Sequence, residues 1–270
     1  MKKLLFLPLL FLSNCSQNGT DTGNPVIALK INGSSNLATV ARSDFWQKVI
    51  EFLVPVAVAG PASISDASSR TIILSELWTT MGEIEFEAEA TASPSEVDGD
   101  EVAFVGPFTT NMLVTTVDPI GTVALNISSL RRIKAKLKQT SVLPSGAPLA
   151  LLNKSIYISG TVGGVAFTFG TTEESEFQVG GPNAVSPASG SELLLQLQIA
   201  NLFRRIDMSS IAAPTDISAG TPIPTANPCP AIDASAADLY TCFRKGLESE
   251  SNLGVDNGDD ELDQNDDLVD

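Results

Sequence analysis

Short stretches of alternating apolar and polar residues dominate the chain between residues 70 and 211, and glycine, proline, asparagine and serine bound them. Period-two alternation over roughly four to eight residues is typical of half-buried β-strands. The pattern predicts strands at residues 71–77, 82–90, 102–108, 112–117, 122–127, 133–137, 155–159, 165–169, 177–179 and 192–203. Because no helix-length pattern separates these runs, they favour a mainly β fold, an antiparallel β-sandwich.

The residues before this region have a different pattern. Two β-type runs, 26–31 and 37–41, flank the turn signal NGSS and predict a hairpin. Residues 43–54 carry apolar side chains at helical spacing and end before Pro55, which predicts an N-terminal amphipathic helix. That helix either packs on the domain or lies in a membrane interface, ahead of a small-residue run that resembles a processing site.

The residues after the strands predict a linker, a short helix and a tail. Four prolines between 222 and 230 favour an extended connection, and residues 233–247 have helical composition with Asp233 as the cap. From residue 248 onward there are ten acidic side chains and no basic one, so the overall net charge of −16 falls to −6 upstream. Such a run is typical of a disordered acidic tail.

Two of the predicted strands carry charge on one face. Acidic residues alternate with apolar ones between 83 and 90, and basic residues do so between 132 and 138. Four like charges on one strand face repel each other unless opposite charges lie beside them, so we expect the two strands to be neighbours across a solvated face. The alternative is a docking surface for a charged ligand. This charge ladder comprises Glu83, Glu85, Glu87, Glu89, Arg132, Lys134, Lys136 and Lys138.

Composition narrows the possible functions. With 43% hydrophobic residues, the chain can bury a substantial core. The absence of histidine from the sequence removes Ser-His-Asp and Cys-His catalysis and histidine-containing metal sites. The acidic balance argues against nucleic-acid binding and against general adhesion to anionic lipid, and it favours a protein or cationic partner. No phosphate-binding loop or nucleophile elbow occurs, and Gly160, Gly163 and Gly164 fit a turn between two strands better than a nucleotide loop.

The first residues predict export. Lys2 and Lys3 precede an apolar run to Leu12, which is typical of a signal peptide over residues 1–14. The following segment LSNC resembles the lipobox of bacterial lipoproteins, which implies cleavage before Cys15 and its lipidation; an ordinary secretory signal is the alternative. Two cysteines then remain, and in an oxidising compartment we expect Cys229 and Cys242 to form a disulfide.

Calcium binding and glycoside hydrolysis are two further alternatives. The tail residues Asp256, Asp259, Asp260 and Asp263 supply the oxygen ligands that calcium prefers, although the EF-hand spacing is not met. Paired carboxylates, Glu173 with Glu174 or Asp98 with Asp100, could serve glycoside hydrolysis. Both pairs lie in polar loops, so we expect no catalytic residues, no cofactor other than possible calcium, and no enzyme.

The segments GTDTGNP, LSELWTTMGEIEFEAEA, VGPFTTNML, KSIYISGTVGGVAFTFG and LQLQIANLF together resemble uncharacterised bacterial outer-membrane lipoproteins with an extracellular β-sandwich module. The resemblance implies a lipid-anchored binding or structural module in the cell envelope, at the outer membrane and facing either the periplasm or the surface. The expected organisation is a signal peptide (1–14), a flexible tether (15–25), short strands with the amphipathic helix (26–60), the β-sandwich domain (61–213), a Pro-rich linker (214–230), a disulfide-tied helical segment (231–254) and a disordered acidic tail (255–270).

Overall fold

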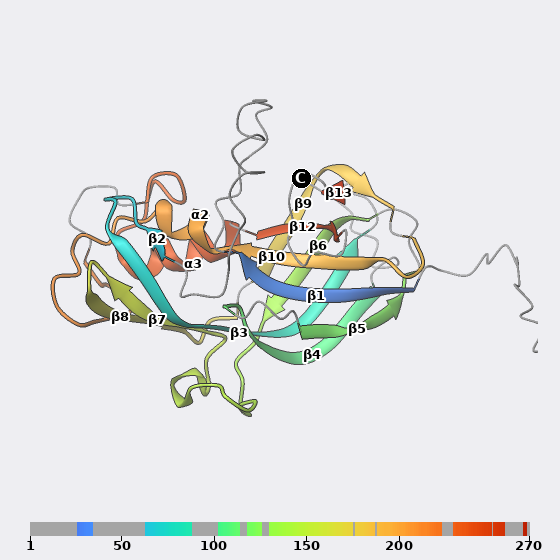
Figure 1. Cartoon of the computed structure of the whole chain (residues 1–270), viewed down its shortest axis with the longest axis horizontal. Helices are drawn as coiled ribbons and strands as arrows, with labels where there is room; N and C mark the ends of the chain where they lie inside the picture. The colour runs from blue at the N-terminus through green and yellow to red at the C-terminus, as the bar shows by residue number, and fades with distance from the viewer. Residues whose placement is uncertain are drawn as a thin grey trace, which may run out of the picture.

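The structure is a computed structural model of the chain and describes residues 26–34, 63–87, 102–113, 118–125, 130–174, 176–186, 188–222, 229–249, 251–256 and 267–268. The described residues are mainly strands with a small helical share (Figure 1). The strands are β1 (Val26–Ser34), β2 (Ser63–Ser65), β3 (Thr71–Glu87), β4 (Val102–Asn111), β5 (Asp118–Ala124), β6 (Leu130–Leu137), β7 (Ile156–Val162), β8 (Val165–Thr171), β9 (Glu176–Val185), β10 (Glu192–Gln198), β11 (Thr215–Ile217), β12 (Ser251–Asp256) and β13 (Asp267–Leu268). The helices are η1 (Leu149–Leu151), α2 (Ile199–Arg204) and α3 (Leu239–Ser249).

The first sheet has five strands in the order β13-β12-β10-β1-β5. Within it, β1 runs parallel to β10 and antiparallel to β5. The expectation of a purely antiparallel fold is therefore wrong, because this sheet is mixed, and β8 with β11 forms a second parallel pair. Alternation along a strand determines which side chains share a face, but it does not specify the direction of a neighbour that lies far away in the sequence.

The second sheet has eight strands, and β3 is its longest. The first half of β3 pairs with β2 and β7, whereas its second half pairs with β4 and β6. We predicted two strands here, 71–77 and 82–90, but a single strand continues from Thr71 to Glu87. The glycine at position 82 lies at a register shift between Met81 and Glu83, so it marks a bulge and does not end the strand.

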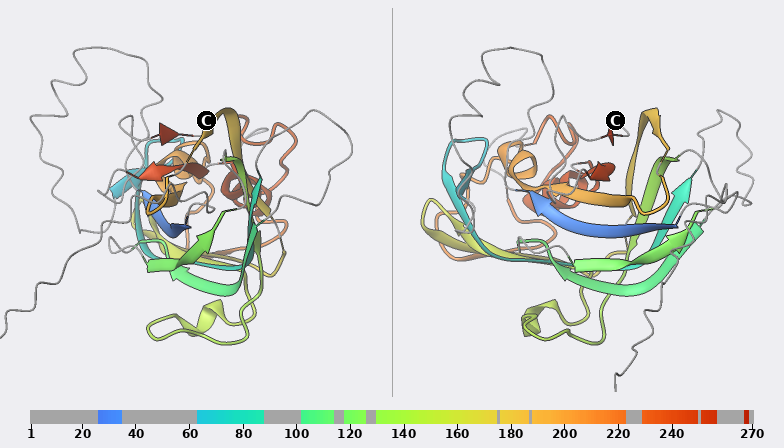
Figure 2. Two further views of the ribbon diagram at one scale, coloured as in Figure 1. Left: turned by 90° about the vertical axis from the view of Figure 1, so that its right-hand side faces the viewer. Right: turned by 45° about the vertical axis from the view of Figure 1, so that its right-hand side comes forward.

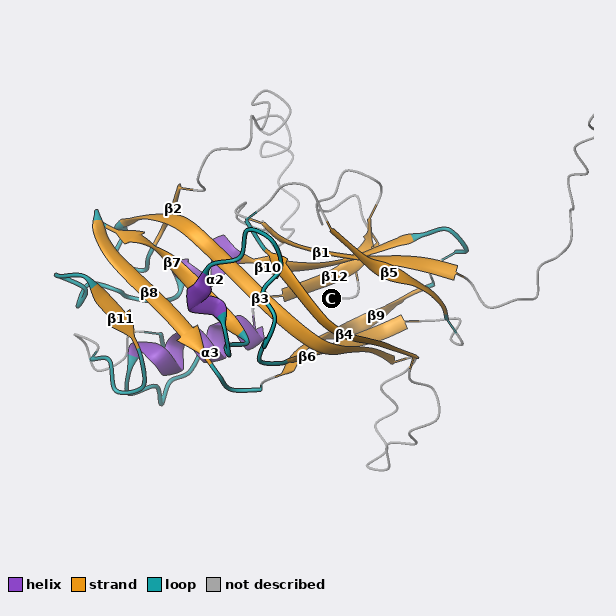
Figure 3. Cartoon of the chain, turned by 90° about the horizontal axis from the view of Figure 1, so that it is seen from below, coloured by secondary structure: helices purple, strands orange, loops and turns teal. Residues whose placement is uncertain are grey.

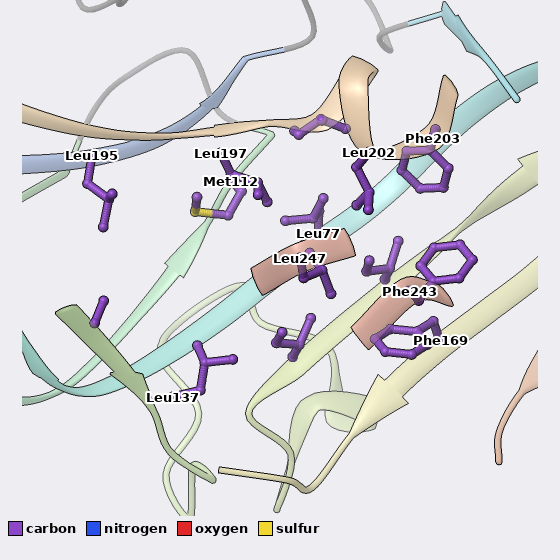
Figure 4. Close-up of a cluster of buried hydrophobic side chains, with 14 of the residues drawn as sticks. Leu77, Met112, Leu137, Phe169, Leu195, Leu197, Leu202, Phe203, Phe243 and Leu247 are labelled. Atoms are coloured by element: carbon purple, nitrogen blue, oxygen red, sulfur yellow. The ribbon is translucent and has the colours of Figure 1, made fainter. Parts of the chain in front are cut away.

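One hydrophobic core takes side chains from strands of both sheets, whose backbones Figure 2 shows from two further sides. Ile27, Leu29 and Ile31 of β1 belong to it, together with alternate leucines of β10. From the other sheet, Leu77, Ile84 and Phe86 of β3 are fully buried. Figure 4 shows part of this core, with labelled side chains from both sheets and α3: Leu77, Leu137, Phe169, Leu195, Leu197, Phe243 and Leu247.

Helix α2 follows β10 directly, although the sequence predicts strand as far as residue 203. Residues 199–203 are all buried, so the apolar run has no exposed face that would reveal helical spacing. Helix α3 forms near its predicted position but begins at Leu239. The predicted cap Asp233 instead accepts from the backbone N–H of Ser235, while Asp238 accepts from the N–H of Thr241 at 2.7 Å. Asp238 therefore caps the helix.

The prediction of a hairpin near the N-terminus is wrong at the expected turn. Asn32, Gly33 and Ser34 do not reverse the chain there but continue strand β1. A Cβ atom at Gly33 would lie 2.5 Å from the carbonyl oxygen of Met112 and 2.6 Å from Cδ1 of Ile199. Glycine is required here by the close approach of neighbouring chain, which a local sequence signal cannot distinguish from a turn. The second run of the hairpin, 37–41, and the predicted helix at 43–54 lie outside the described residues.

Several strand boundaries, the linker and the tail also differ from the predictions. Met112 and Leu113 form a turn after β4, and the next strand spans Asp118–Ala124 in place of 122–127. The Pro-rich linker contributes β11, which extends the second sheet. The tail predicted to be disordered from residue 255 contributes the end of β12 and the short strand β13. Sheet hydrogen bonds from distant strands supply stability that composition alone does not reveal.

Candidate functional surface

The two charged strands are neighbours, as the alternation predicted. In the ladder between β3 and β6, Glu83 lies opposite Lys136, Glu85 opposite Lys134, and Glu87 opposite Arg132. The backbone N–H of Lys138 donates to the carbonyl oxygen of Thr80 just beyond the end of β6, and Glu89 lies outside the described residues. Opposite charges directly across a ladder stabilise one register over its alternatives.

The charge ladder is less solvated than the sequence predicts. Lys136 Nζ lies 2.5 Å from Oε1 of Glu85 and 3.5 Å from Oε2 of Glu83, so one ammonium group bridges two carboxylates. The side chain of Glu85 is only 9% exposed, whereas that of Lys136 is 43% exposed. The hydrogen bond with Glu85 raises the pKa of Lys136 above its ordinary value of 10.5. A carboxylate this deeply buried depends on its cation, because an unpaired buried charge is costly.

We expect Lys136→Met to lower the free energy of unfolding by about 1 kcal/mol, because it leaves Glu85 without this partner. A lysine whose pKa is raised by folding stabilises the protein fully below its unfolded pKa and loses that effect as pH rises through the folded value. The difference between the wild type and Lys136→Met should therefore be constant near neutral pH and shrink above pH 10.5. Urea unfolding at several pH values measures it, with the exposed Lys138→Met as the matched control. An equal loss in both variants would contradict the bridging role.

A protruding loop follows the charge ladder. Residues 138–155, the apolar loop, connect β6 to β7 and contain η1. The loop projects from the body of the molecule on the outer side of the second sheet (Figures 1 and 2). Val142, Leu149 and Leu152 are exposed on it, with exposed fractions of 76%, 82% and 41%. Sequence reasoning missed this surface, although a run of residues 139–153 without charge, outside any predicted strand, was a signal that could have found it.

A polar cluster lies at the base of this loop, on β8 and α3. The hydroxyl of Tyr240 is 2.8 Å from Oγ1 of Thr171 and donates to Oε1 of Glu173 at 3.2 Å. Arg244 forms an ion pair with the same carboxylate, and burial raises the pKa of Tyr240. Ser155, the last residue of the apolar loop, donates to the backbone oxygens of Thr171 and Glu173. The cluster fastens α3 and the loop to the end of β8.

Of the two carboxylate pairs considered for hydrolysis, Glu173 with Glu174 lies among the described residues. Glu173 and Glu174 are both exposed, and Glu173 is held by Tyr240 and Arg244. A general acid in glycoside hydrolysis needs a carboxyl group in a buried setting, whereas both of these carboxylates are exposed. The other pair, Asp98 with Asp100, lies outside the described residues.

Some of the remaining predicted site residues lie among the described residues, and the others lie outside them. Cys229 and Cys242 form the predicted disulfide. Gly163 and Gly164, both with positive φ, make the two-residue turn of the β7–β8 hairpin, as predicted. Gly160, which was predicted to belong to the same turn, lies within β7 opposite Leu74 of β3, where a Cβ would meet the carbonyl oxygen of Ile73. Asp256 ends β12 opposite Glu192. Cys15, Asp259, Asp260 and Asp263 lie outside the described residues. Within the described residues, no group of three or more acidic or cysteine side chains is arranged to hold a metal ion.

Comparison with known proteins finds no match: no family model, no curated protein and no solved structure is detectably similar to this chain. Among the helices that the structure describes, none has both the length and the apolar character needed to cross a bilayer. A function is therefore proposed from the fold and the surface chemistry.

Proposed function

We propose that this protein is an exported, lipid-anchored module of the bacterial cell envelope that acts by binding or by structural contact. The observation that carries the proposal is the Cys229–Cys242 disulfide, which ties α3 to the segment before it. Structural disulfides persist in oxidising compartments outside the cytoplasm. The same compartment is implied by the signal-like N-terminus, whose remaining cysteine, Cys15, is the proposed lipidation site.

We further propose that the two sheets form a β-sandwich. Apolar residues of β1 and β10 share one core with those of β3 and β7, which is the packing that a sandwich requires. Seen from below, the strands of the second sheet cross beneath those of the first (Figure 3). Such a scaffold supports function through the loops and sheet faces that it holds in place.

A binding or structural role is favoured over catalysis by the chemistry of the described surface. Several of its charged groups are paired with one another, as in the bridge between Lys136 and two glutamates and in the Tyr240–Glu173–Arg244 cluster. Its unusual feature is the apolar loop, which exposes large hydrophobic side chains on an ordered projection. Exposed apolar groups of this kind mark contact sites more often than reaction sites.

We expect the wild-type chain, expressed in a bacterial host, to stay in the membrane fraction after a high-salt wash, and Cys15→Ser to move to the soluble exported fraction. The reason is that acyl chains on Cys15 hold the protein by hydrophobic burial, which salt does not weaken. Immunoblotting of the fractions measures the distribution. The double variant Cys229→Ala/Cys242→Ala is the control, since it keeps Cys15 and should remain with the membrane. Identical distributions of the wild type and Cys15→Ser would overturn the lipid anchor.

A further inference from the structure

The apolar loop exposes its hydrophobic side chains from fixed positions. Thr140 closes the base of the loop, because its N–H donates to the carbonyl oxygen of Lys154 and its own carbonyl oxygen accepts from Asn153. Oγ1 of Thr140 also donates to the carbonyl oxygen of Val142 at 2.5 Å, and Leu151 is fully buried as an anchor. The exposure of Val142, Leu149 and Leu152 is therefore built into the fold, and no rearrangement is needed to present them.

Some of the backbone hydrogen-bonding groups of the loop are paired within the loop and need no water. The N–H groups of Ala147, Leu151 and Leu152 donate to carbonyl oxygens inside the loop. Pro144 and Pro148 carry no N–H group at all. Each backbone group that is already paired lowers the cost of moving the loop out of water.

The charge pattern of the loop points to one kind of partner. Residues 139–153 carry no charge, whereas Lys138 and Lys154 stand at the two ends of the loop where it joins the sheet. The Nζ atom of Lys154 lies 5.2 Å from the ring centre of Tyr157 at this base. An apolar projection with cations behind it matches the layered chemistry of a bilayer surface, with hydrocarbon below anionic headgroups. A convex tip also needs no complementary pocket in order to enter lipid.

We propose that the apolar loop contacts a phospholipid bilayer: Val142, Leu149 and Leu152 enter the interfacial region, and Lys138 and Lys154 lie at the headgroups. This contact does not depend on lipidation of Cys15. In a lipid-anchored protein, it would be a second attachment that orients the domain against the membrane, because two weak signals together hold a protein far better than one.

The test places a reporter on the loop itself. In the full chain carrying Cys15→Ser, Ser145→Cys supplies the one free thiol besides the disulfide and is labelled with a polarity-sensitive fluorophore. Vesicles of phosphatidylethanolamine and phosphatidylglycerol at 3:1, which present anionic headgroups to Lys138 and Lys154, are then added. We expect a blue shift at this position and none at Ser218→Cys, an exposed position after β11.

Three further variants sharpen the result. Leu149→Ser with Leu152→Ser should weaken vesicle binding about tenfold or more, because each removes apolar surface that enters the interface. Val142→Ser should also weaken it, whereas Val105→Ser should not, although both valines are 76% exposed. Vesicles that leave the loop reporter unshifted would overturn the proposal, and so would a shift that appears on concentrating the protein without lipid, which would indicate pairing of two copies. Because the protein lacks Cys15 throughout, failure here is separate from failure of the lipid anchor.

Discussion

Phe243→Ala should lower the free energy of unfolding by about 3–5 kcal/mol, the loss expected when a fully buried aromatic ring leaves a cavity. The ring of Phe243 is completely buried and lies 5.1 Å from Phe169, 5.4 Å from Phe203 and 6.3 Å from Phe167, measured between ring centres. These partners come from β8 and α2, so one side chain of α3 joins the helix to the second sheet. Neighbouring aromatic rings add stabilisation beyond the area that they bury.

Urea unfolding followed by circular dichroism measures this loss, with Val105→Ala as the control. Val105 is 76% exposed, so its truncation should change stability by less than about 0.5 kcal/mol. A loss below about 1 kcal/mol in Phe243→Ala would contradict the packing of α3 against the sheet, since even partial collapse of the site leaves a larger cost.

Removal of the disulfide is expected to have the second largest effect. Cys229 and Cys242 are fully buried and separated by 13 positions. Closing a loop of about this length stabilises a protein by about 3 kcal/mol in the chain-entropy model. We therefore expect the double variant Cys229→Ala/Cys242→Ala to lose about 3 kcal/mol, with alanine chosen because it adds no buried polar group.

A reducing agent provides the matched control for the disulfide. Once reduced in denaturant, the wild type should fall to the stability of the double variant, whereas the variant itself should not respond. If the wild type keeps its full stability after complete reduction, the bond contributes nothing and the ordering of α3 rests on packing alone.

The charged strands show what the sequence can predict. Period-two alternation is a local property, and it correctly placed the acidic residues of β3 beside the basic residues of β6. The disulfide was predictable for a similar reason, because only two cysteines remain once Cys15 is assigned to lipid. Burial was not predictable: Glu85 lies on the outward face by pattern, yet its side chain is only 9% exposed, and it pairs there with Lys136.

Contacts between distant segments account for the remaining differences. The parallel pairing of β1 with β10 joins Leu29 to Leu193, and nothing within either strand specifies that neighbour. Gly33 looked like a turn residue but fits against Met112, which is remote in sequence. The apolar loop went unnoticed because Leu149 and the buried Leu151 belong to the same hydrophobic run. Only the folded arrangement shows which of the two faces solvent.

The intact mass of the protein purified from host membranes tests its export, cleavage, lipidation and disulfide formation together. We expect a chain that begins at Cys15, carries added acyl mass there, and is two hydrogens lighter because Cys229 and Cys242 are joined. A full-length chain beginning at Met1, with all three cysteines open to alkylation, would contradict it.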